Sequence, residues 1–300
     1  MSEIKLLDKS VYNRIAAGEV VERPLSIVKE LVENSIDAGA TSVSIDIENG
    51  GTTKISVSDN GKGISPDDVP TAFLPHATSK ISGCEDLDNI RTLGFRGEAL
   101  PSIAAVSRVK MTTRTAGSNM GFVYTVDNGE VIDSGMCGCP YGTSVVVTNL
   151  FEKIPARKKF LKKITVEESA ITATVSKLIL ANYKVSFRYS VNGKLVYQSA
   201  GESMENAVYA VYGKEFFDSL LPVENQMFDI RLSGFACKPS ASKHTKAFQT
   251  LIVNGRYVQN EEVSYWIYGC YMNYLMKRQY PAYVLYLTMP YDLVDVNVHP

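Results

Sequence analysis

The chain has 300 residues, of which 45% are hydrophobic and 21% are charged, and its formal net charge is −1. This length allows about two domains with buried cores, and the near-neutral charge argues against a protein that coats nucleic acid through bulk positive charge. No apolar run approaches the ~20 residues of a membrane-spanning helix, and the amino terminus lacks the basic-then-apolar order of a secretory signal, so we expect an intracellular chain without membrane segments or disulfides.

The clearest predicted helix covers residues 26–37. Val28, Leu31, Val32 and Ile36 recur there at helical spacing, and Pro24 precedes them as a start signal. Two alternating stretches follow at residues 43–47 and 54–58, joined through a glycine-rich turn at 49–51. They predict a β-hairpin.

Further strands and helices are predicted along the rest of the chain. Turn residues separate alternating stretches at 109–114, 122–127, 129–134, 143–149, 185–189, 195–198, 283–288 and 294–298. Helical patterns run from the loop at 94–97 through Ala105 and from Val166 to Ala181, with a basic loop expected at 155–163. A helix followed by many hairpin strands indicates an α+β fold and not a doubly wound parallel sheet.

The most natural domain boundary lies at Gly201-Glu202-Ser203, because a new strand-and-helix pattern begins beyond it. We therefore expect one domain over residues 1–202 and a smaller one over 203–300.

The five cysteines do not form a metal-binding pattern. Only Cys137 and Cys139 are close together, and their C-x-C spacing differs from the paired C-x-x-C of zinc sites. The three histidines are scattered along the chain. Free structural thiols are the favoured interpretation.

Glu30 and Asn34 lie four residues apart on the polar face of the first helix, so their side chains project side by side. A carboxylate there could polarise an attacking water while the neighbouring amide oxygen holds a magnesium ion, the two tasks that phosphate hydrolysis requires. On spacing alone, a solvated helix face is the more common explanation. The neighbouring motifs decide between the two.

The first of these motifs is Asp59-Asn60-Gly61-Lys62-Gly63-Ile64, directly after a strand. The two glycines permit close approach of the backbone to a ligand, and the carboxylate can accept a hydrogen bond from an amine such as that of adenine. An ordinary glycine turn remains an alternative. A calcium-binding EF-hand loop is disfavoured because Gly61 and Gly63 stand where that loop needs oxygen ligands.

A second motif runs from Thr92 to Leu100 and passes from a glycine-punctuated loop into a helix. Backbone amides at such a helix start can hold phosphates. The earlier segment from His76 to Lys80 offers hydroxyls and an ammonium group that could close over a nucleotide. No P-loop, kinase or Rossmann glycine motif is present in the sequence.

The order of these motifs, with a later Gly142-Thr143, resembles the ATPase superfamily of gyrase B, Hsp90, sensor histidine kinases and MutL. Within that superfamily, five strings look like the MutL family of mismatch-repair proteins. They cover residues 15–24, 76–80, 94–100, 253–256 and 294–300. The resemblance extends over essentially the whole chain.

The resemblance implies a two-layer α/β sandwich that binds ATP, followed by a smaller α/β domain like the gyrase transducer. In it, Glu30 is the general base, Asn34 binds Mg²⁺, Asp59 recognises adenine, and a lid covers about residues 73–97. The residues expected to bind the nucleotide are Asn34, Asp59, Gly61, Gly63, Ile64, Thr78, Ser79, Lys80, Leu93, Gly94, Phe95, Arg96, Gly97, Glu98, Ala99, Leu100 and Thr143.

The resemblance also implies partners. ATP is expected to bring two copies together through an amino-terminal arm, residues 1–20, and the clamp is expected to act with DNA, a mismatch-recognition protein and a downstream repair nuclease or helicase. The residues at 21–24 and 76–80 look like those of bacterial members, for which the expected location is the cytoplasm. A eukaryotic source would instead imply the nucleus. A DNA-binding scaffold with little ATPase activity, or a topoisomerase-like or chaperone-like ATPase, is the alternative.

Two departures from the family pattern qualify these expectations. Relatives carry a phosphate-contacting lysine shortly after the His-Pro pair that ends the printed sequence, so we expect weak turnover from these 300 residues, with nucleotide binding retained. The helix after residue 256 is aromatic over 265–274, where relatives often have basic residues. Packing is a better interpretation of these aromatics than DNA stacking.

The best candidates for contacts to DNA phosphates lie in the basic loop, although a solvated charged loop is an equally good explanation. They are Arg157, Lys158, Lys159, Lys162 and Lys163.

Overall fold

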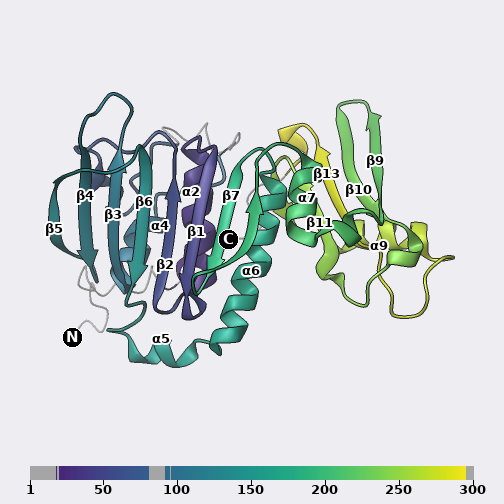
Figure 1. The fold of residues 1–300 in the computed structure, drawn as a ribbon, viewed down its shortest axis with the longest axis horizontal. Coiled ribbons are helices and arrows are strands. Elements are labelled where there is room, and N and C mark those ends of the chain that lie inside the picture. Colours follow the sequence, from purple (N-terminus) through teal and green to yellow (C-terminus); the bar gives the residue numbers. More distant parts are fainter. Residues whose placement is uncertain (1–17, 19, 81–91, 95, 295–300) are drawn as a thin grey trace, which may run out of the picture. The chain divides into compact units, whose positions relative to one another are not determined.

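The computed structural model describes residues 18, 20–80, 92–94 and 96–294. These residues form two compact units. The first contains described residues up to 175 together with 187–198, and the second contains 176–186 together with 199–294 (Figure 1). The expected division into domains 1–202 and 203–300 remains a prediction.

The first unit is built on an eight-stranded sheet with the strand order β5-β4-β3-β6-β2-β1-β7-β8. All strand pairs from β5 to β1 in this order are antiparallel. The strands are β1 (Ser42–Glu48), β2 (Lys54–Asp59), β3 (Arg108–Arg114), β4 (Gly121–Asp127), β5 (Glu130–Cys137), β6 (Gly142–Thr148), β7 (Ser186–Val191) and β8 (Lys194–Ser199).

Helices α2 (Pro24–Asp37) and α4 (Ala99–Val106) lie behind this sheet in Figure 1 and form the second layer. The apolar stripe of α2, including Ile27, Val28 and Leu31, is buried, and so are the alternate residues Ile45 and Ile55 of the sheet. Burying both faces together stabilises the layer contact through the hydrophobic effect. Other helical segments described in this unit include η1 (Asn49–Gly51), α3 (Val69–Ala72), α5 (Pro155–Phe160) and the larger part of α6 (Ile164–Ala181).

The two-layer sandwich predicted from the sequence is confirmed, and so is the predicted hairpin. Ile45 pairs with Val57 and Ile47 pairs with Ile55 in an antiparallel register. The turn at 49–51 forms η1, in which Gly50 has a φ of 66°. That left-handed conformation favours glycine because a Cβ atom would crowd the backbone.

One predicted segment is wrong. Residues 155–160 of the expected basic loop form α5. Pro155 occupies the first turn, where its fixed φ suits a helix and its missing N–H costs nothing, and the following Ala, Arg and Lys residues have high helix propensity. Only residues 161–163 remain outside a helix.

The second unit contains a five-stranded sheet with the order β12-β11-β13-β10-β9. Its strands pair antiparallel except β11 with β13, which are parallel. The strands are β9 (Leu220–Met227), β10 (Ile230–Cys237), β11 (Gln249–Val253), β12 (Arg256–Val258) and β13 (Tyr283–Thr288), and the helical segments are α7 (Met204–Tyr212), α8 (Lys214–Phe217), η3 (Pro239–Ala241), η4 (Lys246–Phe248), α9 (Glu261–Tyr271) and η5 (Tyr291–Leu293).

The aromatic helix predicted after residue 256 is α9, which begins where the Asn260 side chain accepts a hydrogen bond from the Val263 amide. Val263 and Ile267 pack against a core formed by Leu251, Tyr283 and Leu285 in the second unit. By contrast, the aromatic residues Tyr265 and Trp266 are exposed. Packing therefore explains only one face of this helix.

The predicted strand at 283–288 is observed as β13, whereas the one at 294–298 lies outside the described residues apart from Val294. Among the helices that the structure describes, none combines the length and the apolar character needed to cross a membrane.

Candidate functional site

Helix α2 carries Glu30, the predicted general base, and Asn34, the predicted magnesium ligand, outside its buried stripe. Glu30 and Asn34 are each only partly exposed. Burial raises the pKa of the Glu30 carboxyl group, and the positive charges of Lys29, Lys80 and Arg96 oppose this shift. The carboxylate therefore lies in a partly desolvated environment with cations nearby.

Asn34 and Asp37 of α2 share a single ammonium group, that of Lys80. The Lys80 Nζ atom lies 2.8 Å from Asn34 Oδ1 and 2.6 Å from Asp37 Oδ2. The Asp37 side chain is only 6% exposed, so water has little access to this ion pair from the carboxylate side. The segment predicted to close over a nucleotide is thus attached to the helix that carries Glu30.

Asp37 also holds the glycine loop that precedes α4. Its Oδ1 atom accepts a hydrogen bond from the Leu93 amide at 2.9 Å, and its Oδ2 atom accepts one from the Gly94 amide at 3.1 Å. A Cβ atom on Gly94 would lie 3.4 Å from Lys80 Nζ, so the backbone passes close to the ammonium group. Sequence reasoning did not assign Asp37 to the site.

The loop continues as a tight contact between Gly97 and the backbone of Ala77. Gly97 has a φ of 64°, and a Cβ atom there would come within 2.7 Å of the Ala77 carbonyl carbon. Glu98, the N-cap residue of α4, accepts a hydrogen bond from the His76 amide at 3.1 Å, and its Oε1 atom lies 2.6 Å from the imidazole Nδ1 of His76. The two predicted phosphate-binding segments therefore lie against each other.

Other residues predicted for this region have different positions. Ala99 and Leu100 form the first turn of α4, Thr78 Oγ1 accepts a hydrogen bond from the Lys80 amide at 3.2 Å, and Ser79 is exposed. Phe95 and most of the predicted amino-terminal arm lie outside the described residues, as does the middle of the lid.

Asp59 ends β2 beside α2 and accepts hydrogen bonds from three donors. The Ser35 hydroxyl donates to Oδ2 at 2.8 Å, and the amides of Gly61 and Thr143 donate to Oδ1 at 2.8 Å and 3.3 Å. Burial raises the pKa of the Asp59 carboxyl group, while these three donors oppose the rise. A carboxylate has about four acceptor positions, so the contacts among the described residues leave one for a further donor such as an exocyclic amine.

The glycines after Asp59 allow three backbone segments to meet. Gly63 has a φ of 71°, and a Cβ atom there would overlap the carbonyl oxygen of Arg114. The adjacent Ile64 amide donates to Thr113 Oγ1 at 2.9 Å, and Thr113 Oγ1 lies 3.0 Å from Thr143 Oγ1. Thr113 is buried and joins two predicted residues, although the sequence contained no signal for it.

The predicted DNA-contacting residues do not share one environment. Lys158, Lys159, Lys162 and Lys163 are exposed. Arg157 is only partly exposed, and its guanidinium carbon lies 5.8 Å from the ring centre of Phe151. Four exposed cations are therefore available to a polyanion at the end of α5 and the start of α6, and Arg157 has a packing role as well.

The position of this basic segment depends on a buried ion pair. The Glu167 carboxylate is 1% exposed and accepts hydrogen bonds from Arg23 Nε at 3.0 Å and Nη2 at 2.8 Å. Its second oxygen accepts the Lys162 amide at 3.1 Å. The start of α6 is thereby attached to the residue that precedes α2.

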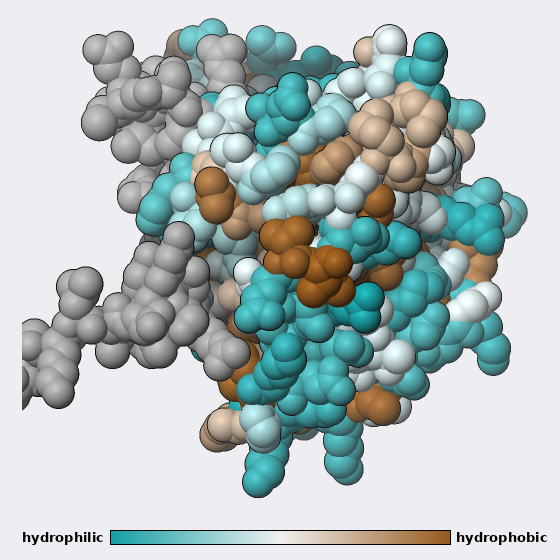
Figure 2. Space-filling view, turned by 90° about the vertical axis from the view of Figure 1, so that its left-hand side faces the viewer, coloured by the Kyte–Doolittle hydropathy of each residue, from teal (hydrophilic) through white to brown (hydrophobic). Residues whose placement is uncertain are grey.

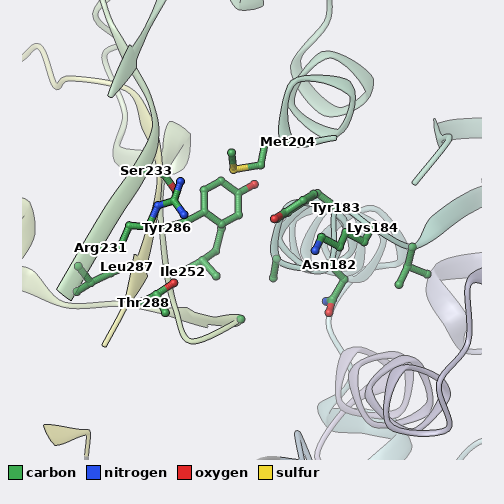
Figure 3. A pocket seen from close by; sticks show the side chains of 13 residues that line it. Asn182, Tyr183, Lys184, Met204, Arg231, Ser233, Ile252, Tyr286, Leu287 and Thr288 are labelled. Atoms are coloured by element: carbon green, nitrogen blue, oxygen red, sulfur yellow. The ribbon is translucent and has the colours of Figure 1, made fainter. Parts of the chain in front are cut away.

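Two surface features involve none of these motif residues. Strand β5 ends the larger sheet and carries the exposed hydrophobic residues Val131, Ile132 and Met136. Figure 2 views the molecule from that side and shows a few hydrophobic residues near the middle of a mostly hydrophilic face. In the second unit, a hollow of about 440 Å³ is lined by residues that include Lys184, Arg231 and Tyr286 (Figure 3).

Comparison with known proteins agrees with this geometry. Residues 23–135 match the model of the histidine kinase-, DNA gyrase B- and HSP90-like ATPases, and residues 208–300 match the model of the DNA mismatch repair protein C-terminal domain. DNA mismatch repair protein MutL of Clostridium acetobutylicum is 42% identical over 99% of this chain, and that of Caldanaerobacter subterraneus is 43% identical over 100%. The chain belongs to the MutL family. It spans about half the length of these MutL relatives, 48% and 51% respectively.

Solved structures of MutL ATPase domains share the fold. The Aquifex aeolicus MutL ATPase domain complexed with ADP is 28% identical and has a TM-score of 0.71, with 90% of this chain and 93% of that chain covered. The N-terminal domain of a DNA repair protein has a TM-score of 0.80 at 28% identity, with 96% and 90% covered. The first unit of this MutL-family chain is therefore an ATPase domain of the gyrase B and HSP90 type.

Proposed function

We propose that the first unit binds ATP with Mg²⁺ and hydrolyses it, and that Glu30 is the general base. One observation carries this proposal. Helix α2 brings Glu30 and Asn34 to the face where Lys80 and the loop at 92–94 converge, while Asp59 lies on the adjacent strand with an acceptor position to spare. The ADP complex of the Aquifex MutL ATPase domain supports nucleotide binding by a fold of this kind.

In this proposal, Asp59 accepts a hydrogen bond from the adenine amine. The backbone at Gly61, Gly63 and Ile64 and the Thr143 segment surround the base, because the glycines allow the chain to approach closely. The phosphates contact Thr78, Ser79, Lys80 and the amides from Gly94 to Leu100, including the amino-terminal end of α4. Charge-assisted hydrogen bonds of this kind are stronger than neutral ones.

Asn34 is the proposed magnesium ligand. Its Oδ1 atom accepts one hydrogen bond from Lys80 and retains a second lone pair, so the donor set suits a hard cation that prefers oxygen. When bound, Mg²⁺ would neutralise charge on the phosphates.

Glu30 is proposed to accept a proton from the attacking water. The water oxygen forms a bond to the γ-phosphorus, the bond from that phosphorus to the bridging oxygen of ADP breaks, and the water proton passes to the Glu30 carboxylate. Burial raises the pKa of Glu30, so this carboxylate becomes protonated at a higher pH than an ordinary glutamate. As the pH falls, hydrolysis is therefore expected to decline before the pH reaches the usual pKa of glutamate.

We further propose that ATP binding drives dimerisation through residues 1–20 and closure of a clamp that acts in DNA mismatch repair. The names of the MutL relatives support the repair role. The exposed lysines at 158–163 are proposed to contact DNA phosphates. A mismatch-recognition protein and a repair nuclease or helicase are the proposed partners, and the bacterial relatives favour the cytoplasm as the location.

The decisive experiment compares Glu30→Gln, Asp59→Asn and the control Glu22→Gln. Glu22 is exposed and precedes the same helix, so the control makes the same change of charge. We expect Glu30→Gln to retain binding of a non-hydrolysable ATP analogue and to lose single-turnover hydrolysis by about 100-fold or more. Asp59→Asn should weaken binding of the analogue itself.

Two results would contradict the proposal. Hydrolysis by Glu30→Gln at the wild-type rate would exclude that residue as the base, and failure of the wild type to bind the analogue would exclude the nucleotide site. Sedimentation with and without the analogue tests dimerisation separately, since a chain that binds the analogue but stays monomeric would refute only the clamp.

A further inference from the structure

We infer that Asp37 is the positioning residue of the phosphate site, which holds Lys80 and the glycine loop in the geometry that a nucleoside triphosphate requires. The inference rests on the proposed function of this site. Asp37 has no proposed contact with the nucleotide or the metal, and it acts through the groups that it holds.

The contacts of Asp37 connect segments that are distant in sequence. Its carboxylate accepts hydrogen bonds from Lys80 Nζ, from the Leu93 amide and from the Gly94 amide, at 2.6, 2.9 and 3.1 Å. Each oxygen therefore has a donor, and one oxygen has two. The side chain is 6% exposed, which leaves little room for water to replace these donors.

These donors belong to the groups expected to hold phosphate. Lys80 supplies the ammonium group, and Gly94 begins the run of amides that leads to α4. Lys80 also donates to Asn34 Oδ1, the proposed magnesium ligand. A single carboxylate on α2 thus sets the relative positions of a cation, a backbone loop and a metal ligand, the kind of preorganisation that anion binding and phosphoryl transfer depend on.

Charge and position make opposite predictions at this residue. Asp37 is itself an anion beside a site for an anion, so removing its charge would tighten phosphate binding if Coulomb repulsion alone mattered. If Asp37 acts by positioning, the same change weakens binding because Lys80 and the glycine loop lose their anchor. The sign of the effect therefore distinguishes the two.

Asp37→Asn in the 300-residue chain makes this comparison. An amide has one acceptor oxygen, so it cannot receive donors on both sides as the carboxylate does. We expect the Kd of a non-hydrolysable ATP analogue with Mg²⁺ to rise about 10- to 100-fold, the effect of losing one or two charge-assisted hydrogen bonds. The affinity for adenosine should stay unchanged, because Asp59 and its partners are untouched.

The matched control is Asp67→Asn, which makes the same chemical change at an exposed position before α3. It should leave both affinities unchanged. Asp37→Glu provides a second variant, because it keeps the charge but moves the carboxylate by one methylene group. Positioning predicts a weaker analogue complex for this variant too, whereas an effect of charge alone predicts none.

Unchanged or tighter binding of the analogue by Asp37→Asn would overturn the inference. A parallel loss of analogue and adenosine would overturn it as well, since that pattern indicates general damage to the site. If Asp37→Asn fails to fold, wild-type affinity in Asp37→Glu would overturn the inference and a selective loss would support it. Wild-type protein that binds neither ligand would instead refute the proposed function itself.

Discussion

Lys177 carries a partly buried ammonium group whose removal should change how stability depends on pH. It lies in the part of α6 that belongs to the second unit, where its Nζ atom is 2.6 Å from Thr250 Oγ1 and 3.1 Å from the Ala247 carbonyl oxygen. Two tyrosines also lie near it, with the Tyr212 hydroxyl at 3.3 Å and the centre of the Tyr257 ring at 5.6 Å. Burial lowers the pKa of Lys177 from 10.5 to about 8.

The sign of the effect follows from proton binding. Below pH 8 both the folded and the unfolded chain carry the proton, so folding bears the full cost of burying the charge. Between pH 8 and 10.5 the unfolded chain binds more protons than the folded chain, so the free energy of unfolding increases as the pH rises. The whole effect is on the order of 3 kcal/mol, because the shift is about two and a half pKa units and one unit corresponds to about 1.4 kcal/mol.

Lys177→Met keeps the length of the side chain and removes the titration. The missing hydrogen bonds contribute a term that is nearly independent of pH, so the informative quantity is the difference between variant and wild type at each pH. Urea unfolding at pH 7, 8, 9 and 10 should show the variant becoming less stable relative to the wild type above pH 8. Lys238→Met, at an exposed position in the same unit, is the control. A difference that stays flat from pH 7 to 10 would refute the argument that the ammonium group is desolvated.

Three further predictions concern the first unit. Glu167→Ala should lower the free energy of unfolding by about 3 kcal/mol in urea titrations, because it leaves the Arg23 guanidinium without its partner; a cost like that of an exposed ion pair would contradict the burial argument. Gly63→Ala should lower the melting temperature more than Gly117→Ala does, since both glycines have a positive φ but only Gly63 faces a backbone carbonyl; equal decreases would show that the close approach costs nothing. Replacing the four exposed lysines Lys158, Lys159, Lys162 and Lys163 by glutamine should weaken DNA binding. The slope of log affinity against log salt concentration should become shallower by about 0.9 for each phosphate that is no longer neutralised. Lys194→Gln is the control, and an unchanged slope would reject the assignment.

Local patterns in the sequence were sufficient to predict most of the first unit. Helix α2 was predictable because its apolar residues recur at one period, and the β1-β2 hairpin because a glycine-rich turn separates two alternating stretches. The error at 155–160 arose because a run of basic residues was interpreted as a loop, although Lys and Arg also favour helices. A run of charged residues therefore predicts exposure to solvent more reliably than it predicts a loop.

The candidate site was only partly predictable for a different reason. Glu30, Asn34 and Asp59 belong to local motifs, so their spacing could indicate their chemistry. The importance of Asp37 depends on which of several polar positions of α2 faces the loop at 92–94, more than 50 residues away, and the Leu93 contact has a separation of 56 residues. Thr113 is a similar case, because its role arises only when β3 and β6 become neighbours in the sheet.

The division of α6 between the two units has a practical consequence for cutting the chain. A fragment that begins after the predicted seam at Gly201-Glu202-Ser203 would lack residues 176–186, which belong to the second compact unit. It would lose the Leu180 carbonyl group that accepts a hydrogen bond from Tyr286, and the Lys177 ammonium group that contacts Thr250. An independently expressed second unit therefore needs the end of α6, supplied either as a linked segment at its amino terminus or as a peptide added in trans.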